Sequence, residues 1–112
     1  MGVPYRPLGL VKEALEQIGI EVSYAYEDLV FIQHNHFLLQ FGKMGAILFY
    51  YANVETAEEA AQQFFREVQR VFGAKGMTLV DRGQYRLTAG AGEELSLHFL
   101  NQSPADRQDD GA

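Results

Sequence analysis

The feature that most constrains the fold is a run of three short segments that are apolar on both sides. These segments are residues 29–33, 36–41 and 46–51, and each has the length and composition of a β-strand. Successive side chains of a strand point to opposite faces of the sheet. Strands in which nearly every residue is apolar therefore have two faces to remove from water, and helices or a partner must cover both.

The turns between these segments predict how their residues face one another. If His34 and Asn35 form a two-residue turn, Val30 lies opposite Leu39. A symmetric turn through residues 42–45 then places Leu39 opposite Leu48. One predicted face carries Val30, Ile32, Phe37, Leu39, Phe41, Ala46, Leu48 and Tyr50. The other carries Leu29, Phe31, Leu38, Ile47, Phe49 and Tyr51, interrupted by Gln33, His36 and Gln40.

Two segments have the apolar spacing of amphipathic helices. In residues 8–18 apolar side chains recur at steps of three and four, with Pro7 before the segment and Gly19 just after it. The segment that begins near Thr56 and ends near Gly73 carries a wider apolar stripe, as expected of a helix that covers a sheet. The Thr56 hydroxyl and the Glu59 carboxylate are spaced to cap its first turn reciprocally.

Further strands are predicted on both sides of the second helix. Residues 20–26 alternate, with Val22, Tyr24 and Tyr26 on one side. Segments 77–81, 84–88 and 94–100 are separated by Arg82-Gly83 and by the glycine-rich residues 90–92. The sequence thus predicts an α+β domain over residues 1–100, with an antiparallel meander in the order helix, four strands, helix, three strands. Residues 101–112 are polar and are expected to form a disordered tail.

Composition and charge exclude several classes of function. The chain has no cysteine, so thiolate metal sites, disulfides and cysteine nucleophiles are ruled out. Its net charge of −6, with scattered basic residues, argues against a nucleic-acid partner, which is bound largely through Lys and Arg. No segment approaches the roughly 20 apolar residues of a membrane span, and the N-terminus does not resemble a signal peptide. We therefore expect a cytoplasmic protein with no nucleic-acid or membrane partner.

Candidate chemistry is sparse. The three histidines, His34, His36 and His98, are the only candidates for a metal site, and no Asp or Glu adjoins the first two to complete one. No glycine-rich loop matches a phosphate-binding pattern, and no serine lies in a nucleophile-elbow context. We therefore predict no catalytic residue and no cofactor.

The second apolar face leaves two interpretations open. In one, a helix covers each face and the sheet is a buried central layer. In the other, both helices share one face, and the surface formed by Leu29, Phe31, Leu38, Ile47, Phe49 and Tyr51 closes a symmetric dimer or receives a partner segment.

In size, acidity, lack of cysteine and order of elements over residues 8–100, the chain resembles the small acidic chaperones of bacterial type III secretion. That resemblance implies a homodimer that binds an extended segment of a client protein across apolar patches. The first hypothesis is therefore a non-enzymatic, chaperone-like binding module that self-associates through the second face, with a protein or peptide client. The alternative is a small-ligand-binding or metal-dependent enzyme with His34, His36 or His98 at the mouth of a pocket.

Overall fold

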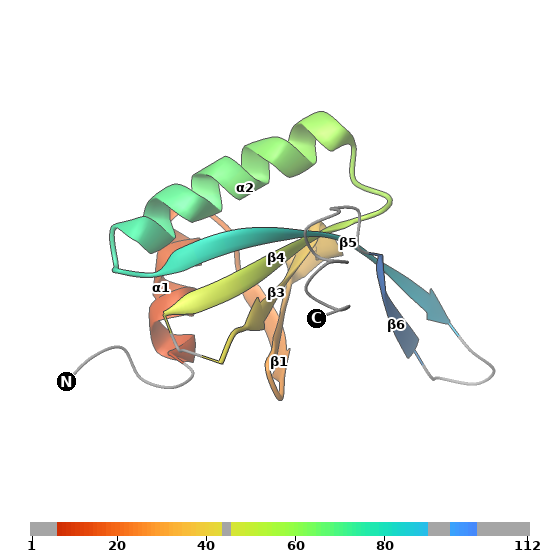
Figure 1. Ribbon diagram of the computed structural model, residues 1–112, viewed down its shortest axis with the longest axis horizontal. Coiled ribbons are helices and arrows are strands. Elements are labelled where there is room, and N and C mark those ends of the chain that lie inside the picture. The colour runs from red at the N-terminus through yellow and green to blue at the C-terminus, as the bar shows by residue number, and fades with distance from the viewer. Residues whose placement is uncertain (1–6, 44–45, 90–94, 101–112) are drawn as a thin grey trace, which may run out of the picture.

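The computed structural model describes residues 7–43, 46–89 and 95–100 (Figure 1). The elements follow in the order α1 (Leu8–Gln17), β1 (Val22–Tyr26), β2 (Leu29–Ile32), the 3₁₀ turn η1 (Gln33–Asn35), β3 (Phe37–Phe41), β4 (Ile47–Asn53), α2 (Glu58–Gly73), β5 (Thr78–Ala89) and β6 (Leu95–Leu100). This arrangement confirms the α+β class predicted from the sequence. The polar segment 101–112 and the glycine turn at residues 90–92 lie outside the described residues.

The six strands form a single sheet in the order β1-β2-β3-β4-β5-β6. Every neighbouring pair is antiparallel except β4 and β5, which run parallel. The meander predicted from the sequence is therefore wrong at this one step. Because α2 crosses the sheet between β4 and β5, it brings the chain back to the end where β4 began, and the next strand starts in the same direction.

The two strands predicted on either side of Arg82-Gly83 are a single strand, β5. Tyr50 pairs with Asp81 and Tyr51 pairs with Gly83, so Arg82 is an extra residue that bulges from the ladder. Gly83 has a φ of 123°, and its N–H donates to the Asp81 carboxylate oxygen Oδ1 at 3.0 Å. A glycine between two strand-like segments is compatible with either a turn or a bulge. The parallel pairing with β4 on both sides of Gly83 makes it a bulge.

Replacing Gly83 with alanine is expected to lower the free energy of unfolding by about 1 kcal/mol or more, because a side chain at a φ of 123° is strained. Gly73→Ala is the matched control: a Cβ at Gly73, the last residue of α2, meets no atom within 4 Å. There alanine should be neutral or stabilising. Urea unfolding of both variants measures the difference. Equal effects would contradict the assignment of strain to Gly83.

The predicted register of the β2–β3 hairpin is confirmed, since Val30 pairs with Leu39. The connection is the turn η1, in which His34 and Asn35 both have positive φ, at 68° and 53°. The β3–β4 register differs from the prediction by two residues, with Leu39 opposite Tyr50 instead of Leu48. A shift of two leaves every side chain on its predicted face.

The helix ends differ in how well the sequence predicted them. Beyond α1, Gly19 has a φ of 78°, and the Ile20 N–H bonds to the Leu15 carbonyl at 2.9 Å, as in a Schellman motif. The capping box predicted for α2 is not formed. The Thr56 hydroxyl instead donates to the His36 carbonyl at 3.0 Å, and no side chain caps the helix. That bond ties the β4–α2 loop to the start of β3.

Both helices pack against the same face of the sheet. This resolves the choice between one helix on each face and two helices on one face in favour of the second. The buried core on this side comprises Val11, Ala14 and Leu15 of α1, Val68, Val71 and Phe72 of α2, and Val30, Ile32, Phe37, Leu39, Phe41, Leu48, Tyr50, Ala52, Met77 and Leu79. Figure 1 shows α2 above the strands and the β5–β6 hairpin extending to the right of both helices.

Candidate functional site

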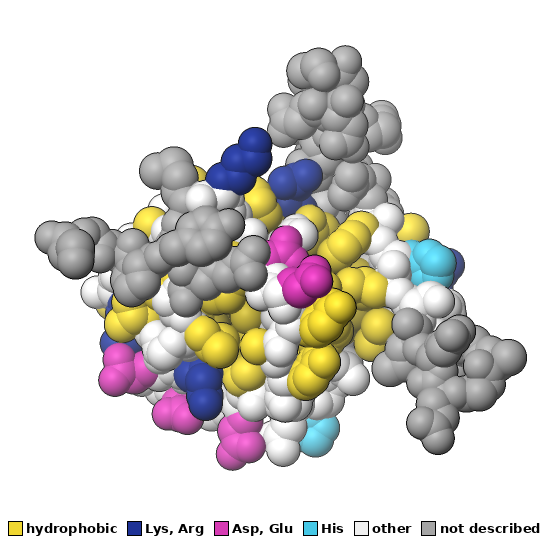
Figure 2. All heavy atoms as spheres, turned by 90° about the horizontal axis from the view of Figure 1, so that it is seen from below, with side chains coloured by type: hydrophobic (Ala, Val, Ile, Leu, Met, Phe, Trp, Pro, Cys, Tyr) yellow, Lys and Arg dark blue, Asp and Glu magenta, His cyan; other side chains and the backbone are white. Residues whose placement is uncertain are grey.

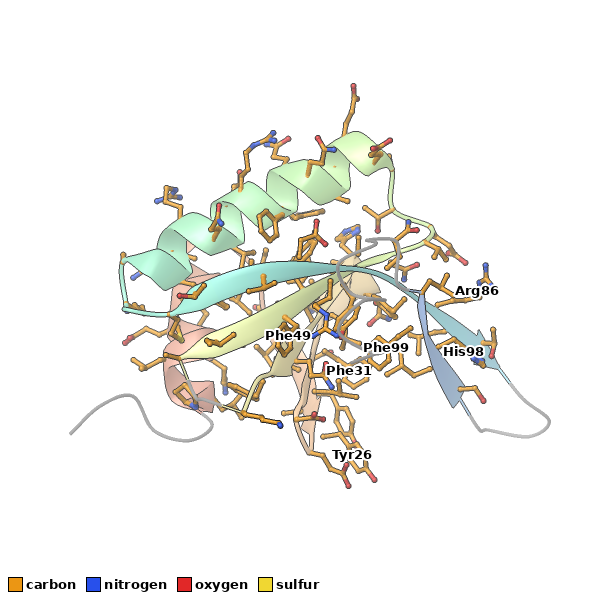
Figure 3. All side chains as sticks on the ribbon, in the orientation of Figure 1. Tyr26, Phe31, Phe49, Arg86, His98 and Phe99 are labelled. Carbon is orange, nitrogen blue, oxygen red and sulfur yellow. The ribbon has the colours of Figure 1, made fainter. Side chains whose placement is uncertain are left out.

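The face of the sheet turned away from both helices, here called the open face, is almost wholly apolar. Strand pairing and alternation assign to it Tyr24, Tyr26, Leu29, Phe31, Leu38, Ile47, Phe49, Tyr51, Val80, Tyr85, Leu87, Leu97 and Phe99. Figure 3 shows Tyr26, Phe31, Phe49 and Phe99 on the side of the sheet opposite α2. From below, hydrophobic side chains gather over this face (Figure 2).

The sheet's own curvature covers the middle of the open face. Leu38, Tyr51 and Tyr85 are buried there in a second, smaller core. The rings of Tyr51 and Phe99 approach to 4.4 Å between centroids, which shows how closely β6 comes to β4. Leu38 and Tyr51, two of the six residues predicted to form an interface, are therefore already buried within the chain.

The other four predicted residues, Leu29, Phe31, Ile47 and Phe49, remain half-buried. The most exposed large hydrophobic side chains of the described residues are Tyr24 at 57%, Tyr26 at 54%, Phe99 at 41% and Val80 at 37%. All four belong to the open face. The apolar surface in contact with water thus lies mainly on β1, β5 and β6, outside the three strands that the sequence analysis singled out.

Sequence reasoning missed these four residues for two reasons. The β1 ladder is irregular between Val22 and Tyr24, so Val22 packs on the helix side while Tyr24 pairs with Phe31 on the open face. Strict alternation wrongly put Val22 and Tyr24 together. The sequence predicted alternating strands around Val80 and Phe99, but it did not show which face of the sheet these two side chains occupy. The strand pairing shows that both lie on the same face as Phe49.

The polar groups on the open face bond to one another within the chain. The Tyr51 hydroxyl donates to Oε1 of Gln40 at 3.0 Å, and Nε2 of Gln40 donates to the Asp28 carboxylate at 3.0 Å. The Arg82 guanidinium lies over the Phe49 ring, 4.6 Å from its centroid. These contacts give the polar side chains partners on an otherwise apolar surface.

A groove on the open face lies between β1 and the β5–β6 hairpin. Its volume is about 370 Å³, and its apolar lining consists of Tyr24, Tyr26, Phe31, Leu87 and Leu97. The rings of Tyr24 and Tyr26 are nearly parallel, at 7°, with centroids 6.4 Å apart. The curl of the sheet thus brings residues of its two edge strands to one depression.

The structure does not bring the three candidate histidines together. The rings of His34 and His36 lie 5.9 Å apart, and His36 stacks on Phe64 of α2 at 5.0 Å. His98 is on β6, exposed, with Nε2 3.4 Å from the Thr88 hydroxyl. Within residues 7–43, 46–89 and 95–100, no three His, Cys, Asp or Glu side chains are grouped closely enough to hold an ion.

A second depression, of about 780 Å³, lies on the helix side near the start of α2, with Tyr50, Glu58 and Asp81 in its lining. The Tyr50 hydroxyl donates to the Ala61 carbonyl at 2.7 Å. Burial raises the pKa of Tyr50 well above its ordinary 10.0, and the negative charge of Asp81 raises it further. Tyr50 therefore stays protonated, and its hydroxyl links β4 to α2 through this hydrogen bond. None of the candidate histidines lines this pocket.

No family model, curated protein or solved structure matches this chain. Among the described helices, none is both long and apolar enough to cross a membrane. A function therefore has to be inferred from the surfaces of the molecule, and the open face is the most distinctive of them.

Proposed function

We propose that this protein is a non-enzymatic protein-binding module that self-associates through the open face of its sheet. One observation carries the proposal: both helices lie on the other face, and the four large hydrophobic side chains that are most exposed among the described residues all belong to this one. Burying such a surface against another polypeptide removes apolar area from water, at roughly 25 cal/mol per Å².

A second copy of the chain is the partner that this surface suits best. The chain carries a net charge of −6, yet the most exposed large hydrophobic side chains of the described residues, those of two tyrosines, a valine and a phenylalanine, all lie on the open face, around its buried middle. Two copies can therefore meet there through apolar side chains, and the Asp28 carboxylate on this face already accepts a hydrogen bond from Gln40. A two-fold axis would place the same apolar patch on both sides, which is the commonest form of association between identical subunits.

The test uses Val80→Glu. Val80 is 37% exposed and lies beside Phe49 in the sheet, so the monomer tolerates a carboxylate at this position. In the dimer the same carboxylate would be buried without a positive charge to pair with it, which is unfavourable. It is preferable to Phe49→Glu, because the Phe49 ring already packs under Arg82. By light scattering, we expect the natural chain to have twice its 12.6 kDa mass. Val80→Glu should weaken the association by about tenfold or more.

Gln69→Glu is the matched control, because it adds the same charge at an exposed position of α2, in the opposite layer of the molecule. It should leave the mass unchanged. A natural chain that stays monomeric at the highest attainable concentration would refute self-association. So would a Val80→Glu variant that assembles as strongly as Gln69→Glu.

A further inference from the structure

The groove on the open face lies between the two edges of the sheet. Tyr24 and Tyr26 come from β1, at one edge, and Leu97 comes from β6, at the other. In the described sheet, β1 pairs only with β2, and β6 pairs only with β5. An edge strand presents N–H and C=O groups that no other strand pairs. The groove is therefore bordered by backbone that can bond to an added strand as well as by apolar side chains.

The two edges differ in how open they are to pairing. The ladder of β1 is interrupted between Val22 and Tyr24, and a bulge of this kind blunts an edge. The ladder between β5 and β6 is regular over six pairs, from Ala89 with Leu95 to Gln84 with Leu100. The sequence of β6, LSLHFL, contains no proline and no lysine, the residues that usually protect an edge. An incoming strand therefore pairs more readily with β6.

The chemistry of the groove limits what such a strand carries. Among the residues that the structure describes, no charged side chain lines it, although the chain has 9 basic and 15 acidic residues. Its polar lining residues are Ser23 and Asn35, and the Ser23 hydroxyl already donates to the Phe31 carbonyl at 3.3 Å. A strand added to β6 would direct alternate side chains toward the open face, into this groove. Those side chains should be apolar and uncharged.

We propose that β6 and the groove form a strand-addition site, which takes an extended segment of another protein with apolar side chains at alternate positions. The segment pairs with the edge of β6 that no described strand pairs, and its alternate side chains rest against Tyr24, Tyr26 and Leu97. Main-chain hydrogen bonds supply affinity in this mode of recognition, and the pocket supplies selectivity. The inference rests on the proposed role in protein binding, but not on self-association.

The probe is a fluorescent peptide with the sequence of residues 95–100, flanked by lysines for solubility. This sequence has the required pattern, because Leu, Leu and Phe alternate with Ser and His. The control peptide has proline in place of the histidine, which removes a backbone N–H and prevents continuous pairing. We expect saturable binding of one probe per chain by fluorescence anisotropy. The control peptide should bind about tenfold more weakly or less.

Three variants of the protein locate the site. Leu97→Asp and Tyr24→Glu put a charge on opposite walls of the groove and should each weaken binding by about tenfold. Tyr24 is 57% exposed, so that variant keeps its fold even if Leu97→Asp does not. Thr88→Asp is the matched control, because exposed Thr88 lies on the same hairpin and points to the other face. It should bind the probe normally.

Hydrogen exchange identifies the docking edge. The probe should slow the exchange of amides in β6 and not of those in β1. Absence of saturable binding, equal binding of the proline peptide, or binding that leaves β6 exchange unchanged would each overturn the proposal. Concentration-dependent protection of β6 without probe would also overturn it, because a second copy would then occupy the edge. Val80→Glu should bind the probe at least as tightly as the natural chain, because Val80 does not line the groove and weaker self-association leaves Tyr24 and Tyr26 accessible, so failure of self-association and failure of strand addition are separately observable.

Discussion

Replacing Leu38 with alanine is expected to lower the free energy of unfolding by about 2–5 kcal/mol, as much as replacing its neighbour Leu39. The two residues are adjacent on β3 and point to opposite faces, yet both are 0% exposed. Leu39 belongs to the core under the helices, and Leu38 belongs to the second core on the open face. A large effect at Leu38 requires that the sheet covers part of its own open face.

Urea unfolding at one fixed protein concentration measures both variants. Val80→Ala is the control on the open face, because Val80 is 37% exposed and its truncation should cost less than about 1 kcal/mol. If Leu38→Ala were as mild as Val80→Ala while Leu39→Ala remained severe, Leu38 would lie on an uncovered surface. The second core would then not exist.

Raising the pH above 10 is expected to destabilise the protein steeply through two buried tyrosines. Burial raises the pKa of Tyr50 above its ordinary 10.0, and the charges of Asp81 and Tyr85 add to the increase. Burial also raises the pKa of Tyr85, partly offset by its hydrogen bond with Asn53. The folded state therefore keeps both phenols protonated at a pH where the unfolded state ionises them. This contribution to stability is complete below pH 10 and is lost as the pH rises toward the folded-state pKa.

Each tyrosine adds a slope of up to about 1.4 kcal/mol per pH unit in this range. Tyr50→Phe is the diagnostic variant. It should lose about 1 kcal/mol at neutral pH, because the hydrogen bond to the Ala61 carbonyl is gone, and its stability should fall less steeply above pH 10. Denaturant unfolding at several alkaline pH values compares the slopes. Parallel curves for the natural chain and Tyr50→Phe would show that this phenol is not held neutral by the fold.

Local sequence predicted the elements that depend on neighbouring residues. The turn at His34 and Asn35 set the pairing of Val30 with Leu39, because positive φ is accessible to Asn and a short hairpin has few registers. Gly19 ended α1 for the same local reason. The division of β2, β3 and β4 into two apolar faces was also predictable. It survived a two-residue error in the β3–β4 register because alternation has a period of two.

The candidate site was less accessible to such reasoning. A bulge reverses the side on which the following residues lie, and nothing in the alternation of residues 20–26 marks the irregularity before Tyr24. The sequence showed an interruption of the strand pattern at Gly83. Whether such an interruption is a turn between two strands or a bulge within one strand depends on the neighbouring strand. For β5 that strand is β4, which is distant in the sequence and runs parallel.

The sequence by itself determined that β2, β3 and β4 would be apolar on both faces, because side-chain alternation in a strand is a local property of the backbone. Only the tertiary structure decided what covers each face. Both helices pack on one side, and the curl of the sheet buries Leu38, Tyr51 and Tyr85 on the other. The exposed apolar surface therefore lies mainly on the edge strands β1 and β6 and at Val80, and not on the three strands predicted from the sequence. Packing between distant segments sets this outcome, so no local pattern could reveal it.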